Sequence, residues 1–130
     1  MKLYRKEGVT IQILCLPDDE VEKGDYLLIE DPRGGRALIA QVVDVQFANI
    51  PGVLEDLLRE SAGERYVNGE DFDPMGISSH IAYIQDARLL ICKIRGAIEN
   101  GRLSLNTSWL PSRPLSRIRK LPMETLLRLA

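Results

Sequence analysis

The stretch RLLICKIRGAIENGRLSLNTSWL, residues 88–110, contains two strand-like runs that meet at Asn100 and Gly101. An Asn-Gly pair tolerates the positive φ angles of a type I′ turn, the turn that commonly joins two antiparallel strands. Gly96 interrupts the first run and indicates either a β-bulge or a close backbone approach, both of which bend the strands of small barrels. The stretch therefore predicts a β-hairpin whose first strand is bent.

Three shorter runs upstream are rich in β-branched and aliphatic residues and are bounded by turn formers, at residues 10–16, 25–31 and 37–47. Such runs predict strands. Gly24 and Asp25 supply a turn into the second of them. In the third run, the apolar residues of one parity are expected to face the core together. These residues are Ile39, Val43, Val45 and Phe47.

The segment EDPRGGR, residues 30–36, is either a phosphate-binding loop or a turn between two strands. A nucleotide-binding loop requires the pattern GxxxxGK[ST], which this sequence lacks. A predicted strand follows the glycines, so no helix N-terminus is available for an anion. We therefore predict a hairpin turn with Arg33 and Arg36 at its exposed tip. The alternative is a basic tip that touches a phosphate or a partner's carboxylate.

Outside these runs, the sequence predicts mainly helix, loop and extended connecting segments. Residues 50–62 have the capping pattern of an inserted helix, and the polar residues 64–80 predict a loop. Pro111 and Pro114 favour extended backbone, as a final edge strand or a linker. Residues 121–130 start an amphipathic helix without a stop signal, so we expect a connector to a missing domain or, alternatively, a short docked helix.

At 130 residues the chain fits one domain with one core. We expect that domain to span residues 1–120 and to be mainly β, a small closed or partly open β-barrel with one helical insertion. Its apolar runs are shorter than the ~20 residues of a membrane-spanning helix. Its start lacks a signal peptide's apolar core. A cytoplasmic protein without membrane contact is expected, with Cys15 and Cys92 as buried, reduced thiols.

Charge is divided unevenly along the chain. Residues 1–87 hold 8 Lys and Arg against 17 Asp and Glu, a net charge of −9, whereas residues 88–130 hold 9 against 2, a net charge of +7. This split indicates an acidic face and a basic face that meet a partner or a second copy of the chain. The alternative is that the two halves interleave in one barrel and their charges mix.

The densest basic cluster consists of Arg113, Arg117, Arg119 and Lys120. On an extended strand, the odd-numbered positions project their charges from one side. The cluster is a solvated edge, a subunit contact or a contact with a DNA backbone. Trp109 is the only aromatic residue nearby that could stack on a base, which weakens the interpretation as a nucleic-acid site.

Residues suited to catalysis or metal binding are sparse. His80 is the only histidine, and no GxSxG motif accompanies it to complete a triad. Glu70, Asp71 and Asp73 lack the spacing of a calcium loop and are interpreted as a solvated acidic loop. We therefore expect no catalytic residue, no cofactor site and no metal site in this chain.

Three segments together resemble the N-terminal HAS-barrel of HerA-type ATPases, which are archaeal DNA translocases of the FtsK-HerA superfamily. The segments are VEKGDYLLIED, ALIAQVVDV and LLICKIRGAIENGRLSLNTSWLPSRPLSRIRKLP. The family opens a strand pair with a Gly-Asp turn, carries an insertion, and ends in a hairpin and a proline-rich connector. Gly24-Asp25, Gly96 with Gly101, and Pro111 with Pro114 stand at those places. Leu115-Ser116 departs from the Gly-Ser step usual in the family.

The resemblance implies a barrel like the crown of rotary ATP synthase subunits, which joins neighbouring subunits and performs no chemistry. It also implies a hexameric ring in a longer protein, whose motor pumps double-stranded DNA and works with a NurA-type nuclease in DNA end resection. A stand-alone barrel that binds nucleic acid through its basic C-terminal part is the alternative function. The candidate contact residues in both cases are Arg33, Arg36, Arg113, Arg117, Arg119 and Lys120.

Overall fold

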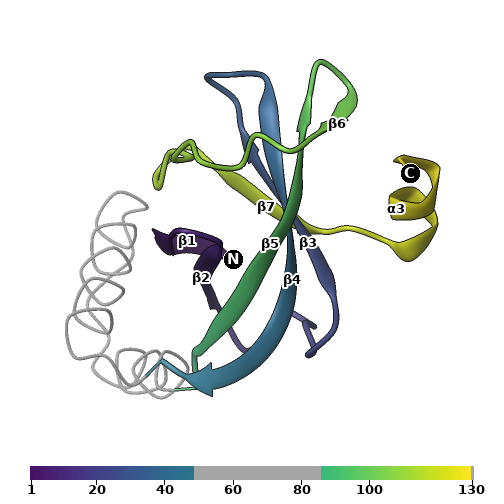
Figure 1. The fold of residues 1–130 in the computed structure, drawn as a ribbon. Helices are drawn as coiled ribbons and strands as arrows, with labels where there is room; N and C mark the ends of the chain where they lie inside the picture. Colours follow the sequence, from purple (N-terminus) through teal and green to yellow (C-terminus); the bar gives the residue numbers. More distant parts are fainter. Residues whose placement is uncertain (49–85, 130) are drawn as a thin grey trace, which may run out of the picture.

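The computed structural model describes residues 1–48 and 86–129, which form β-strands and one short helix (Figure 1). The strands are β1 (Lys2–Glu7), β2 (Thr10–Cys15), β3 (Tyr26–Asp31), β4 (Arg36–Phe47), β5 (Arg88–Glu99), β6 (Arg102–Ser104) and β7 (Arg117–Lys120), and the helix is α3 (Met123–Leu129). The helix predicted over residues 50–62 and the loop predicted over residues 64–80 lie outside the described residues.

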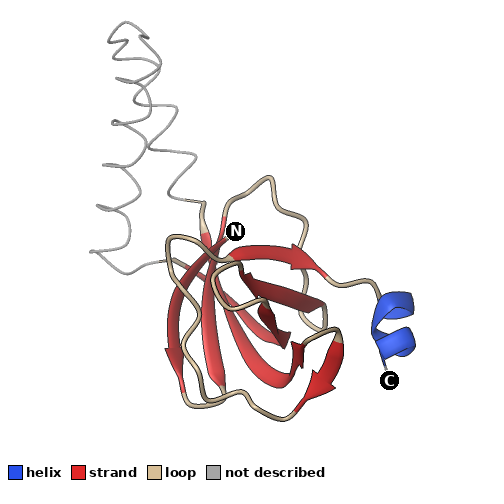
Figure 2. Ribbon diagram, turned by 90° about the horizontal axis from the view of Figure 1, so that it is seen from above, coloured by secondary structure: helices blue, strands red, loops and turns tan. Residues whose placement is uncertain are grey.

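All strand pairs are antiparallel and belong to one sheet, in the order β1-β2-β5-β4-β3-β7, with β6 paired to one end of β5. The sheet curls around a core, and its two edge strands, β1 and β7, approach each other without pairing (Figure 2). The described part of the chain is thus mainly β and forms a curled half-barrel. The prediction of a mainly β, barrel-like fold is confirmed at this level.

Strand β5 organises the sheet because it pairs with three other strands. β2 and β6 lie along one of its edges and β4 lies along the other. Against β4 the register shifts at Gly96: Ile39 is opposite Gly96, but Ala40 is opposite Ile94, so Arg95 is the extra residue of a β-bulge. The predicted bend in this strand is therefore present.

The predicted turns are also in place. Asn100 and Gly101 have φ angles of 52° and 74° and connect β5 to β6, as a type I′ hairpin turn requires. Gly24 has a φ of 98° in the turn before β3, and its amide donates to the carbonyl of Val42 at 2.7 Å. Positive φ favours glycine at such sites because it lacks a Cβ.

Of the residues predicted to form the core face of β4, only Val45 packs against the main core. A second register shift, between Val42 and Asp44, reverses the parity of the strand, because one extra residue moves every later side chain to the other face. Before this shift the interior residues are Leu38, Ala40 and Val42, and after it Val45 packs against the core. Ile39 belongs to a cluster outside the main core, and Phe47 is 66% exposed.

The interior is filled by apolar side chains from all the long strands. Its fully buried members include Ile11, Ile13, Leu27, Ile29, Leu38 and Leu90. Strand β1 was not predicted, because it contributes only Leu3 to the buried core and is otherwise polar or charged apart from Tyr4. Its pairing with β2, rather than its own composition, makes it a strand.

Helix α3 follows Pro122, as the sequence predicts, and lies beside the barrel (Figure 1). Leu126 packs against a cluster that contains Leu28 and Leu121, whereas Met123 and Leu127 are exposed. The described residues contain no helix long and apolar enough to cross a membrane.

The two cysteines are buried free thiols on neighbouring strands, as predicted. Ile11 is the residue opposite Cys92, and Arg88 is opposite Cys15, so the two thiols are not cross-strand partners. Burial raises the pKa of Cys92 to about 12. Burial, followed by the nearby carboxylate of Asp19, also raises the pKa of Cys15.

Candidate functional site

The EDPRGGR segment forms the turn between β3 and β4, at the same end of the barrel as the turn between β5 and β6 (Figure 1). Asp31 and Arg36 are the last cross-strand pair of its hairpin. The amide of Gly34 donates to the carbonyl of Asp31 at 3.4 Å, and Gly35 has a φ of 61°. Strand β4 follows directly, so the prediction of a hairpin turn is confirmed.

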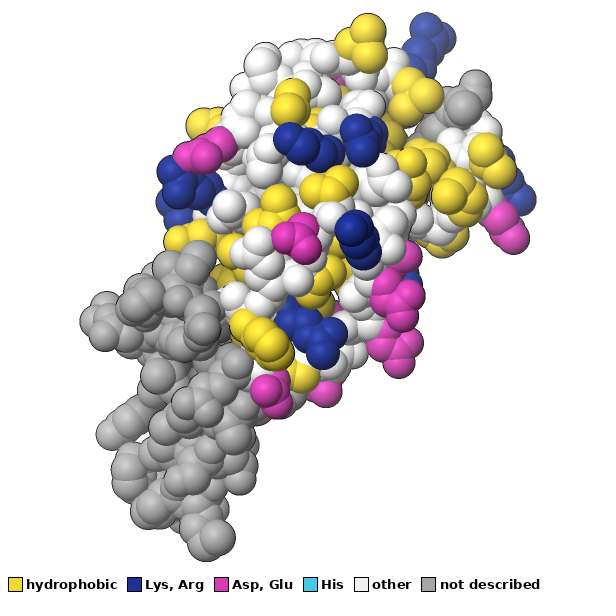
Figure 3. Space-filling model, turned by 60° about the horizontal axis from the view of Figure 1, so that its bottom comes forward, with side chains coloured by type: hydrophobic (Ala, Val, Ile, Leu, Met, Phe, Trp, Pro, Cys, Tyr) yellow, Lys and Arg dark blue, Asp and Glu magenta, His cyan; other side chains and the backbone are white. Residues whose placement is uncertain are grey.

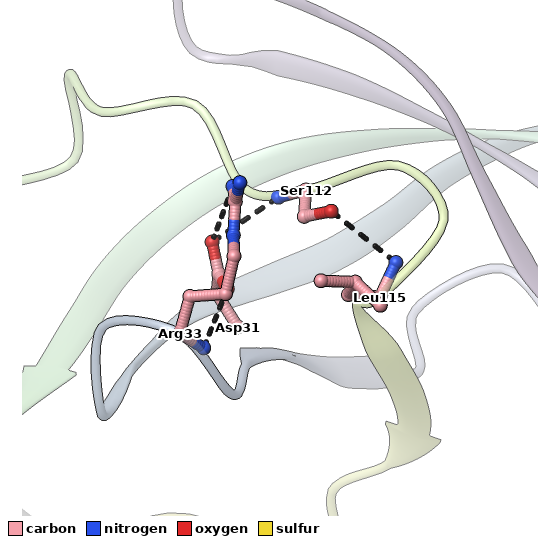
Figure 4. Close-up of polar contacts among 4 residues, drawn as sticks. All are labelled: Asp31, Arg33, Ser112 and Leu115. Atoms are coloured by element: carbon pink, nitrogen blue, oxygen red, sulfur yellow. Dashed lines mark hydrogen bonds and ion pairs between the residues drawn. The ribbon is translucent and has the colours of Figure 1, made fainter.

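Asp31 and Ser112 are the buried polar residues of the part of the chain that the structure describes, and 4% of the surface of Asp31 is exposed (Figure 4). Its Oδ1 accepts hydrogen bonds from the backbone amide of Arg33 at 3.0 Å and from Arg33 Nε at 3.5 Å. Its Oδ2 accepts from the amide of Ser112 at 3.1 Å. Burial alone would raise the pKa of Asp31, but the hydrogen bonds from Arg33 and Ser112 outweigh it and lower the pKa.

These bonds anchor the connector, which we define as residues 105–116 between β6 and β7. Ser112 Oγ accepts from the amide of Leu115 at 3.2 Å, and the Ser112 carbonyl accepts from the amide of Ser116 at 3.1 Å (Figure 4). The connector therefore turns at Ser112 and delivers the chain to β7. Although Asp31 and Ser112 are 81 residues apart in sequence, one carboxylate ties them together.

Trp109 is a second anchor of the connector. Only 9% of its surface is exposed, it packs in the main core, and its Nε1 donates to the carbonyl of Asn106 at 2.9 Å. The guanidinium of Arg36 lies over the Trp109 ring, 4.1 Å from its centroid, a cation–π arrangement. Arg36 is thus half-buried against the connector and does not sit at an exposed tip as predicted. Arg33, by contrast, has an exposed side chain.

A hollow of about 330 Å³ opens between the two hairpin turns. Gly34, Gly35 and Arg36 line it from one hairpin, Glu99 and Asn100 from the other, and Asn106 from the connector. Glu99 is the cross-strand partner of Arg36, but its carboxylate accepts from Asn106 Nδ2 at 3.0 Å instead. The hollow therefore presents a guanidinium, a carboxylate and amide groups side by side. No sequence pattern indicates this hollow, since its walls come from three separate segments.

The predicted basic cluster divides into two parts. Arg119 Nε lies 2.7 Å from Glu30 Oε1, and Lys120 Nζ lies 3.3 Å from Asp25 Oδ2, so these two cations of β7 pair with acidic residues on and before β3. Arg113 and Arg117 are exposed and form no ion pair within the described residues. Exposed pairs of this kind contribute about 0 to 1 kcal/mol each.

These pairs show that part of the acidic first half and part of the basic second half meet within one chain, because β7 pairs with β3. On the face drawn in Figure 3, cationic and anionic side chains lie interspersed rather than in separate fields. The charges of the two halves therefore mix on this face, in line with the interleaved alternative. Arg113 and Arg117 remain the members of the cluster that are available to a partner.

Exposed apolar side chains gather on β6 and the connector. Leu103 is 49%, Leu105 94%, Leu110 69% and Leu115 50% exposed. Scattered surface leucines are ordinary, but four within 13 residues beside a polar hollow form a candidate contact surface. The sequence pattern does not single out these leucines, because local composition does not show which side chains of a connecting segment face solvent.

His80, Glu70, Asp71 and Asp73 lie outside the described residues. Among the residues that the structure does describe, no group of three or more His, Cys, Asp or Glu side chains could hold a metal ion. No protein-family model and no curated protein matches this sequence.

Proposed function

We propose that this chain is a non-catalytic barrel domain for ring assembly and partner docking in a HerA-type DNA translocase that acts in DNA end resection and repair. The observation that carries the proposal is the connector. It is held by the Asp31 carboxylate and by buried Trp109, yet it exposes three leucines and Arg113 to solvent. A surface segment that is fixed in place and apolar is suited to binding, because little conformational entropy is lost when it docks.

The positions of the motifs that resemble the HAS-barrel family support this proposal. Gly24 and Asp25 form the turn into β3, Gly96 adjoins the bulge of β5, and Gly101 lies in the hairpin turn. Pro111 and Pro114 lie in the connector. Gly24, Gly96 and Gly101 thus stand at turns or at a bulge of one curled sheet. On this proposal, the full-length protein forms a hexameric ring that encloses double-stranded DNA and docks a NurA-type nuclease.

The alternative, a stand-alone nucleic-acid-binding barrel, is less well supported. Trp109 is buried and covered by Arg36, so its ring is not available to stack on a base. Arg119 and Lys120 already pair with carboxylates of the same chain, which reduces their attraction for phosphates.

Three measurements on this chain test the proposal. Titration with double-stranded DNA should give only weak binding with a shallow dependence on salt, and calorimetry with magnesium-ATP should give no binding at micromolar concentrations. Sedimentation velocity should show weak, concentration-dependent self-association that Arg117→Glu reduces, with Arg128→Glu on α3 as the matched control. A steep loss of DNA affinity with salt would favour the nucleic-acid-binding alternative, and tight ATP binding would refute a non-catalytic role.

A further inference from the structure

We infer that the hollow between the two hairpin turns is a docking site for an extended peptide that places an acidic side chain against Arg36 and apolar side chains against the exposed leucines of the connector. This inference rests on the proposed docking function and specifies its partner surface. The site is built from the β3–β4 turn, the β5–β6 turn and the connector, which the structure brings to one end of the barrel (Figure 1).

Arg36 is the residue that defines the ligand's charge. Its side chain lies between the Trp109 ring and Gly34, where an added Cβ would come within 3.2 Å of Arg36 Nε. The Nε is buried and has no hydrogen-bond partner among the described residues. Stacking fixes the plane of the guanidinium but satisfies none of its donors, and a carboxylate is the acceptor whose geometry matches a guanidinium edge.

No carboxylate of the described residues fills this role. Glu99 is directly across the strand pair from Arg36, but it accepts from Asn106. Asp31 is committed to Arg33 and Ser112. Arg36 therefore lines the hollow as a cation whose nearest carboxylates are engaged elsewhere.

The surroundings favour an acidic peptide over a nucleic acid. Arg33 and Arg113 are exposed on the β3–β4 turn and the connector, so two of the segments that line the hollow carry further positive charge. Glu99 and the amides of Asn100 and Asn106 add both donors and acceptors to the walls. A peptide backbone has donors and acceptors of its own to meet them, whereas a phosphodiester backbone has only acceptors and cannot donate to the Glu99 carboxylate.

The apolar part of the site is next to the polar part. Leu105 precedes Asn106, which lines the hollow, and is 94% exposed. Leu103 and Leu110 lie on the same stretch of chain and are 49% and 69% exposed. Burying such side chains around a charged contact is the usual arrangement of a small protein interface, in which apolar contacts provide affinity and the charge fixes the register.

The test uses the whole chain and an acetylated, amidated peptide of sequence GLELEG, with binding followed by calorimetry and by the fluorescence of Trp109, the single tryptophan. We expect a dissociation constant of about 10 to 100 µM, and a loss of at least about tenfold for the peptide GLQLQG, which lacks the carboxylates. Arg36→Gln should weaken binding by a similar factor. The matched control is Arg102→Gln, which removes an exposed arginine of the β5–β6 hairpin that does not line the hollow.

Because Arg36→Gln also removes the stacking on Trp109, its folding is checked by circular dichroism. Leu105→Ser provides an independent variant, since a side chain that is 94% exposed is not needed for folding. Leu105→Ser should also weaken the binding of GLELEG, and Leu127→Ser on α3 is its control. Equal affinity for GLELEG and GLQLQG, or no binding at about millimolar peptide, would overturn the inference.

Tighter binding of oligothymidylate than of GLELEG, abolished by Arg36→Gln, would identify a phosphate site and also overturn the inference. Failure of the peptide to bind leaves the self-association measured by sedimentation unaffected, so it can be distinguished from failure of the proposed assembly function.

Discussion

Replacement of Asp31 by alanine is expected to lower the free energy of unfolding by about 2 to 4 kcal/mol. The substitution leaves the amide of buried Ser112 without its acceptor, and an unsatisfied buried donor costs about 1 to 3 kcal/mol. It also removes the hydrogen bonds from Arg33, which are weaker contributors because that side chain is exposed and the longer contact is 3.5 Å. For a domain of this size, the loss corresponds to a fall in Tm of about 7 to 15 °C.

Urea unfolding followed by the emission of Trp109 measures this effect, because the tryptophan lies on the connector that Asp31 holds. Asp31→Asn should lose less, about 1 to 2 kcal/mol, because its amide oxygen still accepts one bond. Asp86→Ala, at an exposed aspartate, is the control and should change stability by less than about 0.5 kcal/mol. A value for Asp31→Ala within the range of this control would refute the anchoring role.

The same residue predicts a dependence on pH. The pKa of Asp31 is lower in the folded chain than its ordinary value of 3.8, so the folded state favours the ionised carboxylate. Its contribution to stability is complete above a pH of about 4 and is lost as the pH falls below that value toward the folded pKa. The difference in stability between the wild-type chain and Asp31→Asn should therefore shrink as the pH falls from 5 to about 3.

Three other outcomes are expected. Gly101→Val should lower the free energy of unfolding by about 1 to 3 kcal/mol, since a β-branched residue resists a φ of 74°. Gly96→Ala should be tolerated, because an added Cβ would only reach ordinary contact with a carbonyl oxygen at 3.8 Å. Equal changes in Tm for the two variants would contradict this expectation. Cys15 and Cys92 should not react with a thiol reagent at neutral pH until urea unfolds the chain, because both thiols are buried and have raised pKa values. Rapid labelling of the native chain would disprove this expectation. Arg119→Glu should lower the free energy of unfolding by less than about 1 kcal/mol, and by less still in high salt, because the ion pair of Arg119 with Glu30 is exposed. A larger loss in urea titrations that does not depend on salt would contradict this expectation.

The local parts of the fold could be predicted from the sequence. The extents of β2, β3 and β4, the hairpin turn at Asn100 and Gly101, and the edge strand after Pro114 follow from preferences of neighbouring residues for particular φ and ψ angles. These preferences act within a few residues and need no knowledge of the partner strand. The same is true of the decision between a phosphate loop and a turn in EDPRGGR.

Only the tertiary structure decided which strands pair and which faces they bury. β5 lies between β2 and β4 although about 40 residues separate it from β4 along the chain, and no local rule selects that partner. The shift between Val42 and Asp44 made the prediction of one core face for β4 only partly right, because a single extra residue moves every later side chain to the other face. β1 became a strand only through its pairing with β2.

The candidate site, too, was decided only by the tertiary structure. Composition identified Arg36 and Trp109 as separate residues of interest, and it placed Arg36 at an exposed tip. The fold stacks one on the other and adds the bond between Asp31 and Ser112. The sequence by itself determines which residues can form turns, extend or carry charge. Contacts between segments 70 or more residues apart depend on how the whole sheet curls, because strand pairing and core packing across the sheet bring those segments together.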